Sequence, residues 1–172
     1  MDTLYFFSKS KDVLPGKGCN EFVNDIEEYK DLANIKDWRK ILSNFYICPF
    51  EYDGKRWNTA EHAFQSKKIE IVDKETSFLF SLDSNSDLSK GNGEVARKHR
   101  KIKLLSLSQQ KEWNSIKHKV LYAILFEKFT QCEIARIVLT ETKHSILTHS
   151  VRSHPIRQYE LEKVRELLSK EK

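Results

Sequence analysis

Residues 42–68, LSNFYICPFEYDGKRWNTAEHAFQSKK, contain the signals that decide the fold. Phe45–Tyr52 is rich in aromatic and apolar residues and predicts a strand, with an edge or bend at Pro49. Asp53–Gly54 is the dipeptide that most strongly favours a two-residue hairpin turn. Lys55–Trp57 is therefore expected to return as the second strand of an antiparallel pair.

A helix is expected directly after this hairpin, with Asn58 or Thr59 as its N-cap. Glu61, Gln65 and Lys68 are spaced i, i+4 and i+7, so they share one helix face. The carboxylate lies in the first turn, where the helix dipole favours its ionised form, and it would suit a general base or a stabiliser of a cationic sugar. The amine could act as a nucleophile if its pKa were lowered. The same spacing also fits a charged surface face, and spacing alone favours that alternative.

Helical patterns dominate the rest of the chain, beside a short strand near residues 4–8 and a long Ser-, Asp-, Asn- and Gly-rich loop at 81–93. No repeat or linker divides the sequence. It therefore predicts one α+β domain over residues 1–172, mostly helical, with a small antiparallel sheet. The expected helices are 21–38 with a break near Asn34, 96–103, a long helix from a cap at Ser108 to about Phe129, 133–139 and 155–168.

Composition limits the class of protein. The chain has 172 residues, enough for one well-packed domain, and 39% of them are hydrophobic. Its three cysteines, Cys19, Cys48 and Cys132, are odd in number and form no CxxC pair, so we expect three reduced thiols and no metal site. No apolar run has the length of a membrane span and no leader pattern opens the chain, so an intracellular, membrane-free location is expected.

Positive charge is concentrated in one region. Residues 97–119 contain eight Lys or Arg and a single acidic residue, Glu112, whereas the whole chain has a net charge of +5. A local positive field attracts phosphate groups, so Arg97, Lys98 and Arg100 are candidate contacts for a diphosphate or a nucleic-acid backbone. The alternative is a solvated helix face without a ligand.

Trp113 and Lys117 are four residues apart on the expected long helix. Such a pair could stack on a base and contact a phosphate or a ribose oxygen. The more common arrangement is a core tryptophan with the lysine stem packed along it.

The chain resembles the NADAR family, the YbiA-like N-glycosidases, over nearly everything from Leu42 to Leu168. The SNF…PF…DGKRW.TAEHAFQSKK string is the most specific part of the resemblance. Further matching positions follow in the family's order: Ala96, Arg97, Trp113, Lys117, Leu121, Ala123, Lys128, Phe129, Gln131, and Leu161, Glu162, Val164 and Arg165 in a closing helix.

The resemblance implies an enzyme that cleaves N-glycosidic bonds of ribosylated compounds without a metal or redox cofactor. It implies catalytic roles for Glu61 and Lys68, with Lys117 as an alternative nucleophile. The substrate-binding positions that it adds to the basic residues are Asn44, Phe45, Trp57, Gln65, Trp113 and Lys117.

Two branches of the family differ in substrate: riboflavin-pathway ribosylamino-pyrimidine phosphates, or ADP-ribose attached to guanine bases in DNA. The 81–93 loop and the basic run from Ala96 resemble the ADP-ribose branch, and Val151–Arg157 lacks the Trp and Gly of the other. We therefore expect a monomeric ADP-ribosyl hydrolase acting on modified DNA. The alternatives are the riboflavin-type activity and a non-catalytic module that binds ADP-ribose or DNA.

Overall fold

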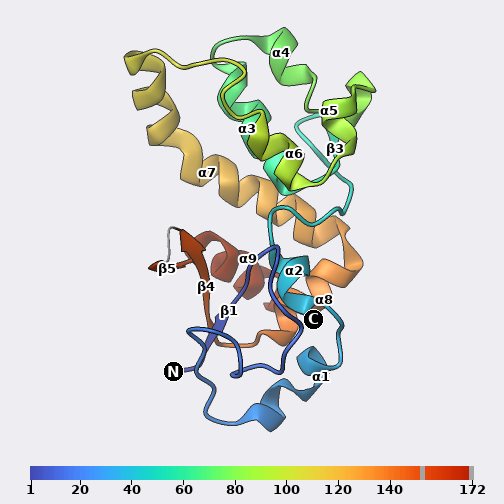
Figure 1. The fold of residues 1–172 in the computed structure, drawn as a ribbon, viewed down its shortest axis with the longest axis vertical. Coiled ribbons are helices and arrows are strands. Elements are labelled where there is room, and N and C mark those ends of the chain that lie inside the picture. Colours follow the sequence, from blue (N-terminus) through green and yellow to red (C-terminus); the bar gives the residue numbers. More distant parts are fainter. Residues whose placement is uncertain (152–153, 171–172) are drawn as a thin grey trace. The chain divides into compact units, whose positions relative to one another are not determined.

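The computed structural model describes residues 1–151 and 154–170, so Arg152 and Ser153 of the Val151–Arg157 stretch lie outside it. The chain divides into two compact units, which are described separately. The first combines Met1–Ser43 with Glu133–Lys172, and the second is Asn44–Cys132. The fold is mostly helical with small mixed and antiparallel sheets, which confirms the predicted class (Figure 1). A single domain over 1–172 stays a prediction.

The hairpin that opens the second unit confirms the sequence signal. Strands β2 (Phe50–Tyr52) and β3 (Lys55–Trp57) pair antiparallel. Asp53 and Gly54 both have positive φ, at 53° and 68°, as a type I′ turn requires. The first strand is shorter than expected, because residues 45–49 do not join the ladder. Trp57, the last residue of β3, is buried and donates its indole N–H to the Tyr52 carbonyl at 2.9 Å.

Helix α3 (Ala60–Glu70) is the centre of the second unit and packs against three helices (Figure 1). These are α4 (Lys74–Phe78), α6 (Gly93–Lys98) and the long α7 (Leu107–Gln131). Thr59 is the N-cap, since its hydroxyl accepts the His62 amide at 3.2 Å. Asn58, the other candidate N-cap, does not cap the helix, because its side chain donates to backbone carbonyls before α6. Glu61 consequently remains in the first turn, as predicted.

Other boundaries in this unit differ from the expectations. The 81–93 loop includes a 3-10 turn, η2 (Leu82–Ser84), and a short helix, α5 (Asp87–Lys90). The expected helix at 96–103 is α6, which starts earlier and ends at Lys98. Helix α7 is capped by Ser106 rather than Ser108, because Ser106 and Gln109 form a reciprocal capping box. None of the described helices is both long and apolar enough to cross a membrane.

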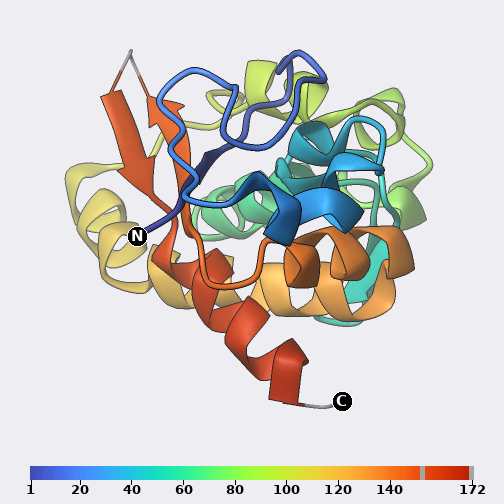
Figure 2. The same ribbon diagram turned by 90° about the horizontal axis from the view of Figure 1, so that it is seen from below.

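The first unit is built on a mixed sheet (Figure 2). Strand β4 (Ile146–Val151) pairs in parallel with β1 (Thr3–Tyr5) and antiparallel with β5 (His154–Arg157). Helix α9 (Tyr159–Lys170) packs on β4 and on α8 (Glu133–Glu141), which in turn packs on α2 (Trp38–Leu42). The prediction of a helix from residue 155 was wrong, because β5 occupies that position and α9 starts only at Tyr159. The core includes Leu4, Trp38, Val138, Leu147 and Leu161.

The helix expected at 21–38 is broken into pieces: η1 (Ile26–Tyr29), α1 (Lys30–Ala33) and α2. The break near Asn34 was anticipated, but the start at Glu21 was wrong. The carboxylate of Glu21 is buried in an ion pair with Arg39 at 2.8 Å. It also accepts the amides of Gly16 and Gly18, both at 2.9 Å. These bonds hold residue 21 in a turn instead of a helix.

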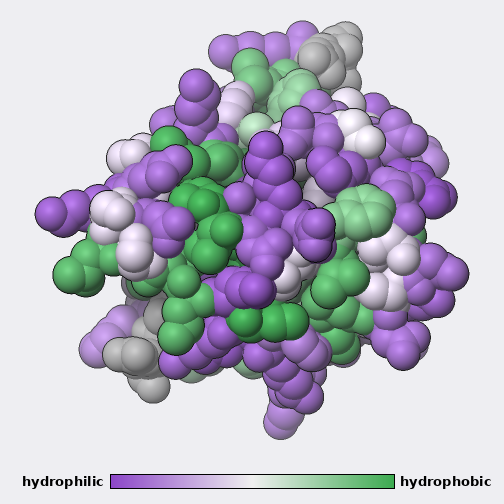
Figure 3. Space-filling model, turned by 90° about the horizontal axis from the view of Figure 1, so that it is seen from above, coloured by the Kyte–Doolittle hydropathy of each residue, from purple (hydrophilic) through white to green (hydrophobic). Residues whose placement is uncertain are grey.

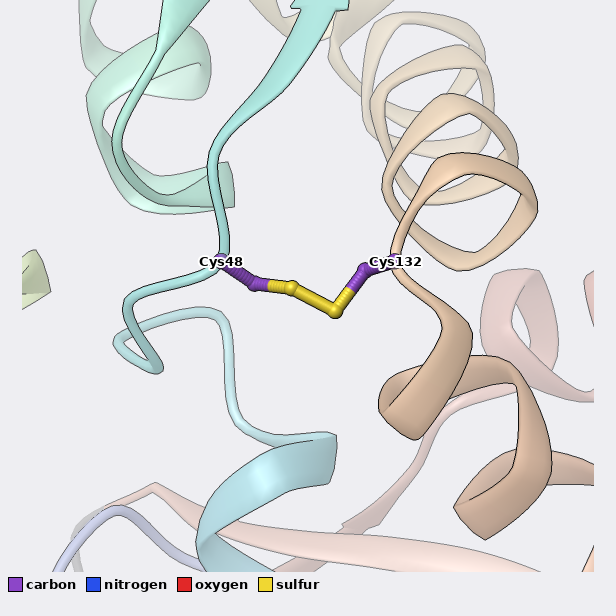
Figure 4. The surroundings of a disulfide bond; sticks show 2 residues. All are labelled: Cys48 and Cys132. Carbon is purple, nitrogen blue, oxygen red and sulfur yellow. A yellow bond between two sulfur atoms is a disulfide. The ribbon is translucent and has the colours of Figure 1, made fainter.

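A disulfide joins Cys48 to Cys132 within the second unit (Figure 4). Their Cα atoms are 6.2 Å apart, although 84 positions separate them in sequence. Beside it, the side-chain amide of Gln131 bonds both backbone groups of Glu51, at 2.7 and 2.8 Å. The prediction of three reduced thiols was therefore wrong for this pair, and Cys19 is free and exposed.

Candidate active site

Glu61 is the centre of the candidate site. Its side chain is buried, with the residue only 4% exposed, and one carboxylate oxygen accepts the Gln65 amide N–H at 2.7 Å. The same oxygen lies 3.5 Å from the Arg97 guanidinium. The backbone amide of Glu61 donates to the Asn44 carbonyl at 3.0 Å. Four of the predicted site residues are thus brought together from α3, α6 and the segment before β2.

Lys68 lies one turn beyond Gln65, half-buried, and its Nζ donates to the Arg100 carbonyl at 2.9 Å. Burial is the main cause that lowers the pKa of Lys68, and the charges of Arg97 and Arg100 lower it further, whereas Glu61 raises it. The net direction, which the sequence left open, is downward. The Lys67 ammonium pairs with Asp53 at 2.8 Å and is not among the charges that shift the pKa of Lys68.

Phe45 packs closely on the first residue of α6. Its carbonyl accepts the Gly93 amide at 3.1 Å. A Cβ on Gly93 would lie 2.7 Å from two ring atoms of Phe45 and still closer to its Cα. Only glycine permits this approach. The glycine at position 93 therefore admits Phe45 against the start of α6.

Two residues that the sequence reasoning did not place in the site support it. The Asn58 side chain donates to the carbonyls of Lys90 and Gly91, at 3.0 and 2.8 Å, and so fixes the turn before α6. His62 is fully buried between the Thr59 hydroxyl at 2.8 Å and the Leu88 carbonyl at 2.9 Å. Burial lowers the pKa of His62, which favours the neutral ring. The available sequence signal for Asn58 was its position directly before the N-cap of the helix.

The two tryptophans of the predicted site, Trp57 and Trp113, are core residues in this structure. Trp57 and Trp113 are 1% and 4% exposed, and Trp113 makes an edge contact with Phe64 at 5.0 Å between ring centroids. Lys117 donates to Asn114 on its own helix at 3.2 Å. This arrangement matches the core alternative for Trp113, and no described contact joins Lys117 to Glu61. Substrate contacts by these residues stay predictions.

The basic segment, residues 97–103, continues from the end of α6 into an exposed turn. Arg97, Lys98 and Arg100 are all exposed, and the Arg100 guanidinium donates to the Arg97 carbonyl at 3.0 Å. Lys103 is anchored to Asp73 at 2.8 Å, and this contact holds the pKa of the Asp73 carboxyl well below its usual range. Four exposed cations of this segment, Arg97, Lys98, Arg100 and Lys101, therefore lie outside the Lys103–Asp73 pair, and Arg97 among them contacts the buried Glu61.

Apolar side chains are also exposed near this segment, notably Leu104 and Leu107. Hydrophobic residues on the face drawn in Figure 3 form several separate groups between hydrophilic ones.

The second unit is mostly helical, and it brings a carboxylate, an amide and a half-buried lysine together beside exposed cations. The chain belongs to the NADAR domain family, whose profile matches residues 33–155. The matched range includes every residue discussed for the site.

Curated relatives are distant. The chain is 24% identical over 136 residues to N-glycosidase YbiA of Escherichia coli strain K12, covering 75% of this chain and 68% of that protein. It is 26% identical over 123 residues to N-glycosidase YbiA of Shigella sonnei strain Ss046, covering 70% of this chain and 62% of that protein.

The NMR structure of E. coli YbiA is similar to this one, with a TM-score of 0.60 and 27% sequence identity. The match covers 77% of this chain and 80% of the YbiA chain. The family and the fold are thereby established, and the substrate is left to the chemistry of the site.

Proposed function

We propose that this protein is an N-glycosidase that removes ADP-ribose from guanine bases in DNA. The observation that carries the proposal is the contact between Arg97 and Glu61, which joins the buried carboxylate to the exposed basic segment. A diphosphate and a DNA backbone are both polyanions, so cations next to the reacting carboxylate suit this substrate. The names of the YbiA relatives support the reaction type.

The reaction breaks the bond between C1 of ribose and a base nitrogen, and positive charge develops on C1. Glu61 is suited to stabilise that charge or to take a proton from the attacking water, because its carboxylate is buried and fixed by Gln65. The contact between Glu61 and Arg97 is long, so the carboxylate can act on the sugar or the water when the arginine turns to the substrate's phosphates. Arg97, Lys98 and Arg100 are the proposed phosphate contacts.

Lys68 offers a second route. Its unprotonated amine would attack C1 as the base departs, and opening of the ribose ring would give a Schiff base that water then hydrolyses. The lowered pKa of Lys68 increases the unprotonated fraction that such an attack needs. If this route is not used, Lys68 is a cation that positions the substrate.

One experiment separates this proposal from its alternatives. The protein is incubated with an oligonucleotide carrying ADP-ribosyl-guanine and, separately, with ribosylamino-pyrimidine phosphates, and the products are resolved by mass spectrometry. Release of ADP-ribose with restored guanine supports the proposal. Cleavage of the pyrimidine compounds alone would assign the riboflavin-type activity. Binding of the oligonucleotide without turnover would assign a non-catalytic reader. A DNA substrate would also put the protein inside the cell.

A further inference from the structure

The two ends of the Gln65 amide have different surroundings. Its Nε2 donates to Glu61 at 2.7 Å. Its Oε1 is buried and, among the residues that the structure describes, has no hydrogen-bond partner. Buried acceptors are nearly always satisfied because an unmet one costs stability. An orphan acceptor next to a candidate catalytic carboxylate points to a donor that arrives with the substrate.

The orientation of the amide follows from the chemistry of its neighbour. An ionised carboxylate only accepts hydrogen bonds, so the NH₂ end of Gln65 must face Glu61 and the carbonyl must face away. Nε2 and Oε1 share one carbon atom. An acceptor is therefore held one amide width from the carboxylate that is proposed to face C1 of the sugar.

The donor closest to C1 on a ribose is the hydroxyl of the adjoining carbon. We infer that the Gln65 carbonyl accepts a hydrogen bond from the ribose 2′-hydroxyl and makes the site selective for ribosides over 2′-deoxyribosides. This inference rests on the proposed function. A site built to bond a hydroxyl rejects the analogue that lacks it, because its buried polar group is then left unpaired.

Such selectivity answers a problem that the proposed substrate poses. An ADP-ribosylated guanine in DNA carries two N-glycosidic bonds, one to the ADP-ribose and one to the 2′-deoxyribose of the strand. Cleavage of the second bond would leave an abasic site. The 2′-hydroxyl is present next to C1 of the ribose that is to be released and absent next to C1 of the 2′-deoxyribose. Gln65 is positioned to form a hydrogen bond with it.

Access to the carbonyl requires a movement, since the atom has no contact with solvent. Arg97 is suited to move because its side chain is 53% exposed and its contact with Glu61 is long, at 3.5 Å. Transfer of this guanidinium to the incoming diphosphate would release the arginine's contact with the Glu61 carboxylate at the moment when the sugar arrives.

The test compares ADP-ribose with its analogue lacking the 2′-hydroxyl of the terminal ribose, by calorimetry. The wild-type protein should bind ADP-ribose at least about tenfold more tightly than the analogue. Gln65→Met, which has a similar volume, should bind both equally at the weaker level. Gln110→Met on the exposed surface of α7 is the matched control and should keep the preference. Equal binding by the wild type, or a preference retained in Gln65→Met, would overturn the inference.

Gln65→Glu guards against misfolding of the first variant. It keeps an acceptor, so the 2′-hydroxyl preference should survive. A second carboxylate beside Glu61 should also raise the apparent pKa of the acidic limb of the turnover profile. A pH profile of turnover that is not shifted, together with a lost preference for the 2′-hydroxyl, would contradict the inference. Cleavage of ADP-ribosyl-guanine without any dependence on the 2′-hydroxyl would reject this role of Gln65 alone. The absence of both binding and cleavage would reject the proposed function itself.

Discussion

Glu61 and Arg97 are 36 residues apart and belong to different helices, yet their side chains meet at 3.5 Å. Glu61 is buried and Arg97 is half exposed, so the pair connects the interior of the second unit to its basic surface.

Replacement of Glu61 by Gln should leave the fold intact and remove most turnover. The amide has the same shape but no charge, so it cannot stabilise a cationic sugar or accept a proton. We expect a loss of at least about 100-fold in kcat, with an unchanged melting temperature. Glu112→Gln, on the exposed face of α7, is the control and should be fully active. Near-wild-type turnover in folded Glu61→Gln would exclude the catalytic role.

Removal of two cations from the basic segment should reduce the salt dependence of DNA binding. In the Arg97→Ala, Arg100→Ala protein, each lost phosphate contact should lower the log–log slope by about 0.9 on duplex DNA or about 0.7 on a single strand. Lys30→Ala with Lys36→Ala removes the same charge from exposed positions in the first unit and should leave the slope unchanged. Equal slopes in the two double variants would show that the segment is only a solvated face.

If Lys68 attacks C1, borohydride should trap a Schiff base on the peptide that carries it. Because the pKa of Lys68 is lowered, the trapping yield should rise with pH and level off below about 10.4, the value for a free lysine. Lys68→Arg keeps the charge without the nucleophile and should lose both trapping and turnover, whereas Lys67→Arg should retain both. Turnover without trapping, or a trapped peptide containing Lys117, would leave Lys68 as a positioning cation.

Reduction of the Cys48–Cys132 disulfide should destabilise the protein, because the bond closes a long loop in the unfolded chain. The expected cost is about 2–4 kcal/mol, seen as a lower midpoint in urea. The Cys48→Ser, Cys132→Ser protein should have the same urea midpoint as the reduced wild type, and dithiothreitol should not change that midpoint. Cys19→Ser, at the exposed free thiol, should behave as wild type. A midpoint that dithiothreitol does not change would show that the bond is absent or contributes nothing.

Alanine at Gly93 should disturb the site through packing. The added methyl group would collide with the Cα and ring of Phe45, and we expect a cost of about 1–3 kcal/mol in unfolding free energy together with weaker ligand binding. Because the closest atom is backbone, Phe45→Leu in the same protein should not restore stability. Rescue by that second change would mean that only the ring is in the way.

Local signals in the sequence predicted the hairpin and helix α3 well. Asp53–Gly54 requires positive φ values that few other pairs adopt, and Thr59 caps the helix within three residues of itself. These features depend on neighbours in the chain. The common face of Glu61 and Gln65 follows from helix geometry alone, and it was predicted for the same reason.

The misses share a dependence on distant contacts. Strand β4 pairs with β1, more than 140 residues earlier, so no local pattern distinguishes it from a loop or a helix end. The partner of Cys48 is 84 positions away, and the spacing carries no information about it. Arg97 was identified as a phosphate contact from charge, but its contact with Glu61 depends on the packing of α6 against α3.

The central claim is that the Glu61 site hydrolyses the bond between ADP-ribose and guanine. The most direct measurement is the mass of an oligonucleotide containing one ADP-ribosyl-guanine before and after incubation with the wild-type protein and with Glu61→Gln. The account predicts that the wild type releases free ADP-ribose and returns the oligonucleotide to its unmodified mass, while the variant leaves it modified. An unchanged oligonucleotide with the folded wild type, or equal release by both proteins, would contradict it.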